Sequence, residues 1–278
     1  MTQTISIIGL GWLGLPLAKA LKADGFNVKG SKSSSEGVEK VLAEGIDCQL
    51  FNTTLDFSLR ESGVRDLFNC DTMIVTLPPN AHHGVKKYPS IVKALGKTAH
   101  YCGVKRLIFT GSISVYGDQT GNLTEEAILD PVSDSGKAIQ VIEDALIHEV
   151  NIPVTILRLG GLIGADRHPA RALSGRNDVK NPHHPVNLVH QNDVIEMIKA
   201  LVKSDWESNQ IYNVVADSHP TRIDYYTNMA DTLGISAPIF VEDAESAENK
   251  NNRETEGKVI DGSKITRDYG VHYTAGIY

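Results

Sequence analysis

The residues with the clearest chemical meaning form a glycine-rich run near the start of the chain, Gly9-Leu10-Gly11-Trp12-Leu13-Gly14. The β-branched run at residues 5–8 precedes it, and apolar residues at helical spacing follow it. A strand, a G-x-G-x-x-G turn and a helix in this order are typical of a dinucleotide site. Gly9 allows the tight turn, Gly11 lets a pyrophosphate approach the backbone, and Gly14 lets the helix pack against the strand. The helix N-terminus then attracts the phosphates.

The residues that end the second predicted strand bear on which dinucleotide binds. An NAD-specific site usually places Asp or Glu about 20 residues after the glycines, where it binds the ribose 2′-hydroxyl. Here Ser31, Lys32 and Ser33 occupy this place, and two hydroxyls and a cation suit a 2′-phosphate. The nearest acid, Glu36, comes further along the chain. We therefore expect NADP as the cofactor; NAD, or a polar loop without a ligand, is the alternative.

Further cofactor contacts are expected from the turn itself and from the exit of a later strand. Trp12 and Leu13 lie at the start of the predicted helix, where the backbone faces the phosphates. Leu77 and Pro78 follow an apolar run, where the chain should pass close to the cofactor. Proline at such a place stiffens the exit of the strand.

Short apolar runs alternate with amphipathic segments through the first half of the chain. Strands are predicted at residues 5–8, 27–30, 72–76, 106–110 and 154–158. Helices are predicted at residues 13–23, 88–101 and 136–150. This alternation indicates an α/β fold with a doubly wound, mostly parallel sheet of the Rossmann type. The ligand crevice of such a sheet lies at the carboxyl ends of its strands.

The pattern changes after residue 158, where a stretch rich in Gly, Pro, His and Arg begins. Residues 160–187 read as more loop than core, and a helix at 194–202 and a strand at 211–215 follow. We predict a Rossmann domain formed by residues 1–160 plus 186–217. A small substrate lobe would comprise residues 161–185 plus 218–278. Residues 242–256 are polar and charged, which predicts an exposed or mobile loop.

Composition restricts the classes of partner and location. The chain has 278 residues and a net charge of −7, which argues against nucleic acid as its main partner. No stretch approaches the roughly 20 apolar residues of a membrane helix, so no membrane partner is expected. The N-terminus lacks the pattern of a secretion signal, and the three cysteines lack metal-binding spacing. We expect a cytoplasmic protein with reduced thiols.

Residues 107–118 (LIFTGSISVYGD) are similar to the "SSxxVYG" strand of the extended short-chain dehydrogenases/reductases, a group that includes the nucleotide-sugar epimerases and dehydratases. Residues 157–164, 187–194 and 211–214 agree with the same family in order. The chain resembles an atypical branch of this family over nearly its whole length, to about residue 235. The resemblance implies a Rossmann fold, an NAD(P) cofactor and an epimerase-, dehydratase- or reductase-like activity.

The resemblance also implies roles for four residues. Ser112 matches the family's serine, and Lys137 matches the lysine of a Tyr-x-x-x-Lys pair on the next helix. Ser133 stands where the tyrosine, the family's general base, is expected. Loss of a general acid/base costs on the order of 10²–10⁴-fold in rate, which puts the usual mechanism in doubt. Tyr116 either packs structurally or lines the substrate site. Other candidates for a replacement base are Asp118, His82, His83 and His168.

The predicted substrate side carries Arg167, His168 and Arg171, with Arg176 further along. The arginines would cluster if the segment turns helical after Pro169. Guanidinium groups bind phosphate or carboxylate in bidentate fashion, so the cluster predicts a small anionic substrate. A solvated basic face is the alternative.

Two functions fit these observations. The first is an NADP-dependent enzyme of the epimerase/dehydratase type with an anionic, nucleotide-sugar-like substrate. The second is a catalytically silent dinucleotide-binding protein that acts as a redox sensor or regulator, which the serine at position 133 favours. By analogy with related proteins, a homodimer through the helices at 88–101 and 136–150 is also expected.

Overall fold

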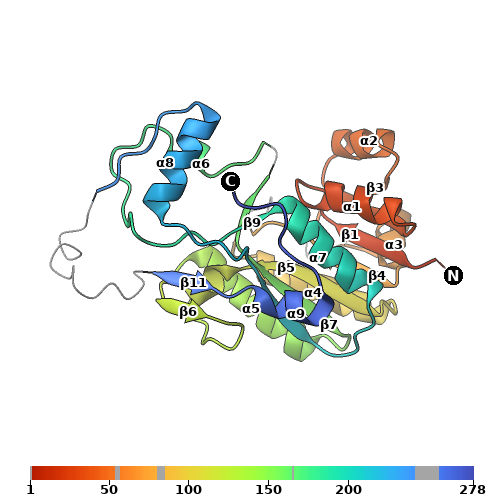
Figure 1. Cartoon of the computed structure of the whole chain (residues 1–278). Helices are drawn as coiled ribbons and strands as arrows, with labels where there is room; N and C mark the ends of the chain where they lie inside the picture. The colour runs from red at the N-terminus through yellow and green to blue at the C-terminus, as the bar shows by residue number, and fades with distance from the viewer. Residues whose placement is uncertain (1, 54–56, 80–84, 165, 242–256) are drawn as a thin grey trace. The chain divides into compact units, whose positions relative to one another are not determined.

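A computed structural model of the chain describes residues 2–53, 57–79, 85–164, 166–241 and 257–278. The chain divides into two compact units (Figure 1). Unit 1 comprises residues 1–115, 131–158 and 195–212, and unit 2 comprises residues 116–130, 159–194 and 213–278. Each unit is therefore assembled from several separate stretches of the sequence.

A seven-stranded sheet with the order β10-β7-β5-β4-β1-β2-β3 forms the centre of unit 1. Its strands are β1 (Thr4–Ile8), β2 (Asn27–Lys32), β3 (Asp47–Leu50), β4 (Thr72–Val75), β5 (Arg106–Ser112), β7 (Val154–Leu159) and β10 (Gln210–Val214). Strand β1 pairs in parallel with both β2 and β4, and the pairs β2–β3 and β4–β5 are also parallel. The chain winds outward from β1 to β3 and then returns to β4. This confirms the predicted doubly wound sheet, and its switch point lies between β1 and β4.

The helices of unit 1 cover this sheet. They are α1 (Gly14–Ala23), α2 (Ser35–Ala43), α3 (Ser62–Phe68), α4 (Tyr88–Tyr101) and α5 (Asp134–Glu149), and α7 (Gln191–Lys203) runs from unit 2 into unit 1. Helices α4 and α5 pack against each other, whereas α1 lies on the opposite face of the sheet (Figure 1). A Cβ placed on Gly96 of α4 would lie 2.9 Å from Cγ2 of Val150, so glycine permits this close approach.

A buried ion pair ties α5 to β7. The Glu143 and Arg158 side chains are only 4% and 3% exposed, and Nη2 of Arg158 lies 2.8 Å from Oε2 of Glu143. Nε of Arg158 donates to the other carboxylate oxygen, Oε1, at 3.2 Å, which makes the contact bidentate. Burial raises the pKa of the Glu143 carboxyl, and the Arg158 guanidinium opposes this shift. The pair therefore fixes the position of α5 on the sheet.

Unit 2 has its own core and two small parallel sheets. Strands β6 (Gly121–Leu123) and β11 (Lys258–Ile260) form one sheet, and β8 (Gly161–Ile163) and β9 (Leu188–His190) form the other. The helices include α6 (Ala170–Leu173), α8 (Arg222–Leu233) and α9 (Ser263–Tyr269). The core contains Ile163, Ala170, Val186, Leu188, Ala216, Tyr225, Met229 and Ile277.

Residues 160–187 and 242–256 of unit 2 were both expected to form loops. Most described residues of 160–187 lie outside helices and strands and are not buried, although Ile163, Ala170 and Val186 belong to the unit 2 core. The segment 242–256 lies outside the described residues. Within the described part of the chain, no helix is both long enough and apolar enough to cross a bilayer.

The buried ion pair yields a stability prediction. We expect Glu143→Gln to lower the free energy of unfolding by about 3 kcal/mol, because Arg158 would stay buried without its counter-charge. Urea unfolding followed by circular dichroism measures this change. Glu149→Gln, on the exposed side of the same helix beside Lys93 and Lys97, is the matched control and should leave stability nearly unchanged. Equal losses in the two variants would contradict a special role for the buried pair.

Candidate functional site

The three motif glycines have different surroundings in the turn between β1 and α1. Gly9 has φ +106°, a conformation that L side chains rarely adopt. A Cβ on Gly14 would lie 2.2 Å from the carbonyl oxygen of Gly9, so only glycine fits there. Around a Cβ on Gly11, by contrast, no described atom lies within 4 Å. The protein thus constrains the first and last glycines itself, and the middle one faces open space that a ligand could occupy.

The turn lies at the switch point of the sheet, which is where ligands bind in this class of fold. Thr76 and Leu77 follow β4, the neighbour of β1, and Cδ2 of Leu77 would be 3.1 Å from a Cβ on Gly9. Tyr88 donates a hydrogen bond from its hydroxyl to the Leu77 carbonyl at 2.6 Å. Pro78 is exposed at this exit. Leu77 therefore packs against the glycine turn.

The start of α1 presents backbone rather than side chains to the turn. Leu13 occupies the N-cap position, and no side-chain cap is found there among the described residues. The Leu13 side chain is 7% exposed, so only its backbone can face a phosphate. Trp12 is partly exposed. The first helical turn, residues 14–17, carries no acid that would repel an anion.

The residues at the end of β2 have distinct environments. Ser31 is 2% exposed, and its hydroxyl accepts a hydrogen bond from the Gly9 N–H at 3.1 Å. Lys32 is the last residue of β2, and Ser33 is exposed just before the N-cap of α2. Glu36 pairs with Lys40 at 2.6 Å. Lys32 and Ser33 are therefore better placed than Ser31 to meet a ligand, because the Ser31 hydroxyl is directed into the turn.

Ser112 ends β5, and its hydroxyl accepts a hydrogen bond from the Ser114 N–H at 3.1 Å. Tyr116, in unit 2, is fully buried and donates from its hydroxyl to Oδ1 of Asn213 at 2.7 Å. Of the two roles considered for Tyr116, this environment is the one expected if the side chain packs structurally. Asp118 is exposed, and His82 and His83 lie outside the described residues.

Helix α5 carries the two residues predicted to replace the Tyr-x-x-x-Lys pair. Ser133 is its N-cap, and its hydroxyl accepts from the Gly136 N–H at 3.1 Å. Lys137 is exposed. Two other residues of α5 approach β5: Cγ2 of Ile139 and Oε1 of Glu143 would each lie 3.5 Å from a Cβ on Gly111.

The basic residues predicted for the substrate side lie on or near the short helix α6 of unit 2. The segment does become helical after Pro169, where α6 begins, and Arg171 is exposed on it. Arg167 is also exposed, and its backbone pairs with Gly164. Arg176 is exposed near Asp178, at 3.9 Å. Arg167 and Arg171 are thus available to solvent.

His168 is held by structural hydrogen bonds at both ring nitrogens. The Ala170 N–H donates to Nδ1 at 3.3 Å, so the ring proton is on Nε2, which lies 3.0 Å from the Tyr225 hydroxyl. That hydroxyl donates in turn to the Ile277 carbonyl at 3.1 Å. Burial and, less strongly, Arg171 lower the pKa of His168. Both ring nitrogens of His168 thus have partners within the protein, and its contact with a substrate stays a prediction.

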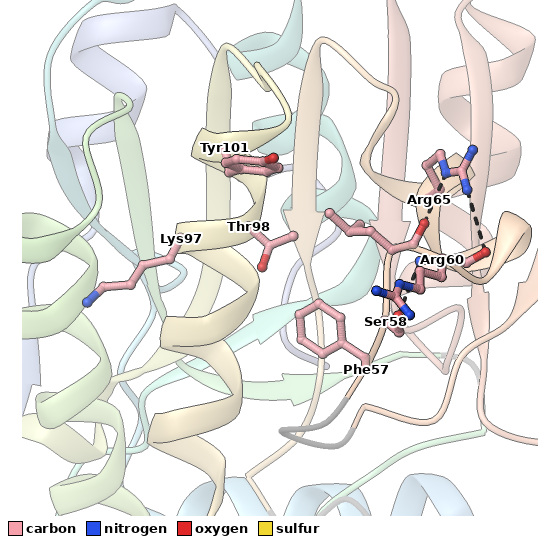
Figure 2. Close-up of a pocket in the computed structure, with 8 residues that line it drawn as sticks. Phe57, Ser58, Arg60, Arg65, Lys97, Thr98 and Tyr101 are labelled. Carbon is pink, nitrogen blue, oxygen red and sulfur yellow. Dashed lines mark hydrogen bonds between the residues drawn. The ribbon is translucent and has the colours of Figure 1, made fainter.

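Figure 2 shows a separate hollow of about 520 Å³ in unit 1, beside α3 and α4. Phe57 and Tyr101 contribute rings to it. Lys97 points away from the hollow, toward Glu149 at 3.1 Å (Figure 2). Arg65 donates from Nε to the Leu59 carbonyl at 3.0 Å. Lys97 and Arg65 are thus held by groups of the protein, and the hollow contains none of the site residues predicted from the sequence.

The comparison with known proteins settles the family. Protein YeeZ of Escherichia coli (strain K12) is 37% identical over 272 residues, which cover 98% of this chain and 96% of the relative. The chain belongs to the YeeZ family. In addition, a family profile described as the NAD binding domain of 6-phosphogluconate dehydrogenase matches residues 4–97, the region that holds the glycine turn and the exits of β2 and β4.

Solved structures show the fold across the whole chain. The Bordetella bronchiseptica enzyme WbmG, in complex with NAD and UDP, has a TM-score of 0.78 at 16% identity and covers 99% of this chain and 91% of its own. UDP-glucuronic acid 4-epimerase from Bacillus cereus, in complex with NAD, has a TM-score of 0.77 at 16% identity and covers 99% and 94%. The chain thus shares its fold with these two enzymes over almost its whole length, which agrees with the Rossmann fold predicted from the sequence.

The different surroundings of Gly11 and Gly14 predict that a substitution of Gly11 affects ligand binding, whereas a substitution of Gly14 affects stability. We expect Gly11→Ala to keep the melting temperature and to lower the affinity for NAD(P)H at least about tenfold, because its methyl group occupies the open space. Gly14→Ala should instead destabilise the fold by about 1–3 kcal/mol, because its Cβ meets the Gly9 carbonyl. Thermal unfolding and fluorescence titration measure the two effects. A Gly11→Ala protein that binds normally would show that no ligand approaches this glycine.

Proposed function

We propose that this chain is an NAD(P)-dependent enzyme of the epimerase/dehydratase type that prefers NADP and acts on an anionic, nucleotide-sugar-like substrate. One observation carries the cofactor part of this proposal. At the switch point of the sheet, Gly9 and Gly14 are constrained by the protein, whereas no atom of the described residues lies within 4 Å of a Cβ on Gly11. A turn that only joined a strand to a helix would have no need of glycine at that position.

The preference for NADP is supported by the charges at the end of β2. Lys32 supplies a cation at the place where an NAD-specific site carries an acid. Glu36, the nearest carboxylate along the chain, is paired with Lys40 one helical turn further on. Ser33 adds an exposed hydroxyl. These groups would favour a 2′-phosphate over a bare ribose hydroxyl.

The substrate class is supported by unit 2. Arg167 and Arg171 are exposed around α6, where guanidinium groups could bind a phosphate or carboxylate. The structure of WbmG, which shares the fold, contains UDP, an anionic nucleotide. In this proposal Ser112 orients the reacting oxygen and Lys137 binds the nicotinamide ribose. A base other than tyrosine must move the proton.

The catalytically silent alternative also has an observation in its favour. The hydroxyl of Ser133 caps α5, and Ile139, one of the two α5 side chains that approach Gly111 of β5, is apolar. Neither can transfer a proton as a tyrosine paired with a lysine does. In this alternative the chain binds a dinucleotide and passes its redox state to a partner. A homodimer through α4 and α5 and a cytoplasmic location stay predictions under either function.

Parallel calorimetric titrations with NADPH and NADH test the cofactor proposal. We expect NADPH to bind more tightly, and Lys32→Ala to weaken NADPH about 10- to 100-fold with little change for NADH, because one charge-assisted contact is lost. Lys19→Ala, which removes the same charge from an exposed site on α1, is the control. Equal affinity for the two cofactors in the wild type would refute the preference, and binding of neither would refute the cofactor site.

A turnover assay separates the enzyme from the silent protein. We expect NADPH-dependent conversion of a nucleotide-sugar to fall at least about 100-fold in Lys137→Met, if this lysine positions the nicotinamide ribose. Lys93→Met, on the exposed side of α4, should retain the wild-type rate. Wild-type protein that binds NADPH but converts no substrate in a broad screen of nucleotide-sugars would favour the silent alternative.

A further inference from the structure

Two hydroxyl side chains hold the peptide groups of Gly9 from opposite sides. The Gly9 N–H donates to Oγ of Ser31 at 3.1 Å. The Gly9 carbonyl accepts from Oγ1 of Thr76 at 2.6 Å. Ser31 comes from β2 and Thr76 directly follows β4, and these two strands flank β1. The turn is therefore fastened to both neighbours of the strand from which it emerges.

These contacts extend the sheet past the end of β1. Backbone hydrogen bonds join the Thr76 N–H to the Ile8 carbonyl at 3.0 Å and the Leu10 N–H to the Ser31 carbonyl at 2.9 Å. Between them, the positive φ of Gly9 turns the backbone out of the sheet geometry. Side-chain hydroxyls then supply the partners that strand backbone supplies elsewhere. Because a buried N–H without a partner is costly, the Ser31 hydroxyl satisfies a requirement of the turn.

The same contacts bear on the start of α1. A Cβ on Gly14 would be 2.2 Å from the Gly9 carbonyl oxygen and 2.9 Å from Oγ1 of Thr76. The Gly9 carbonyl also accepts from the Gly11 N–H at 2.8 Å. A carbonyl fixed by Thr76 therefore sets the position of Gly11 and the distance between the turn and the first turn of the helix. Those are the groups that a pyrophosphate would meet.

We propose that Ser31 and Thr76 are positioning residues that hold the phosphate-binding turn, and that Ser31 does not read the 2′-phosphate. This inference rests on the proposed cofactor site. It changes the interpretation of Ser31, which the sequence grouped with Lys32 and Ser33. Ser31 is only 2% exposed, and its hydroxyl is bonded to the Gly9 N–H. Its effect is therefore on the binding of the pyrophosphate, which NAD and NADP share.

The first test measures the turn without any cofactor. Thr76→Val removes the donor while keeping the shape of the side chain, and Ser31→Ala removes the acceptor. We expect amide hydrogen exchange in residues 9–14 to become about tenfold faster in both variants, and Thr76→Ser to restore the wild-type rate. Thr110→Val is the matched control, because the Thr110 hydroxyl donates to the Val75 carbonyl of the same sheet, at 3.2 Å, without touching Gly9. Unchanged exchange in Thr76→Val and Ser31→Ala would overturn the proposal.

The second test measures the consequence for binding. We expect Thr76→Val and Ser31→Ala each to weaken NADPH and NADH alike, by roughly 5- to 10-fold, as the loss of one hydrogen bond implies. Thr76→Ser should bind within about twofold of wild type, and Thr110→Val should bind normally. A loss confined to NADPH in Ser31→Ala would show that Ser31 contacts the 2′-phosphate and would overturn its assignment. Wild-type protein that binds neither cofactor would refute the proposed function instead, and the exchange experiment would still decide whether the two hydroxyls hold the turn.

Discussion

The contact between the Gly9 carbonyl and Gly14 is the constraint on which the geometry of unit 1 depends. Since a Cβ on Gly14 would lie 2.2 Å from that carbonyl, α1 can start where it does only with glycine at this place. The Gly9 N–H and carbonyl are fixed by Ser31 and Thr76, which come from the two strands beside β1. The two peptide groups of Gly9 therefore link three strands and a helix at the point where the order of the sheet reverses. The surroundings of Gly9 are fixed by these contacts within the protein before any ligand binds.

A second constraint acts on the other side of the sheet. The bidentate pair of Glu143 and Arg158 fixes α5 against β7, and a Cβ on Gly111 of β5 would be 3.5 Å from Oε1 of Glu143. Ser112 follows Gly111, so the end of β5 lies beside a helix that cannot shift without exposing or stranding a buried charge. The glycine turn at residues 9–14 is held by close backbone contact, whereas the end of β5 is held beside α5 by the buried ion pair. Both give rigid support to groups that a substrate or cofactor would meet.

Particular residues show what the sequence could and could not predict. The runs at 5–8, 72–76 and 106–110 are β-branched and apolar, and the structure confirms them as β1, β4 and β5. Strand β3 was missed, because Asp-Cys-Gln-Leu carries no alternating pattern and forms a strand only through its partner β2. The hydrogen bonds of Ser31, Tyr116 and His168 were equally hidden, since their partners are 22, 97 and 57 residues away. Spacing in a sequence identifies a motif, but such long-range hydrogen bonds appear only after folding.

The open space beside Gly11 has a consequence for how this family can diverge. A mutation at Gly14 or Gly9 disturbs the fold and is removed by selection whether or not the protein binds a cofactor. A mutation at Gly11 meets no described atom, so in a lineage that has ceased to use a dinucleotide nothing in the fold would preserve this glycine. Relatives that keep glycine at the first and third positions but carry a larger residue at the second would thus be recognisable as descendants that retained the scaffold and abandoned the ligand. The residue at position 11 would thus indicate whether a relative still binds a dinucleotide, whereas glycine at positions 9 and 14 indicates only that the fold is kept.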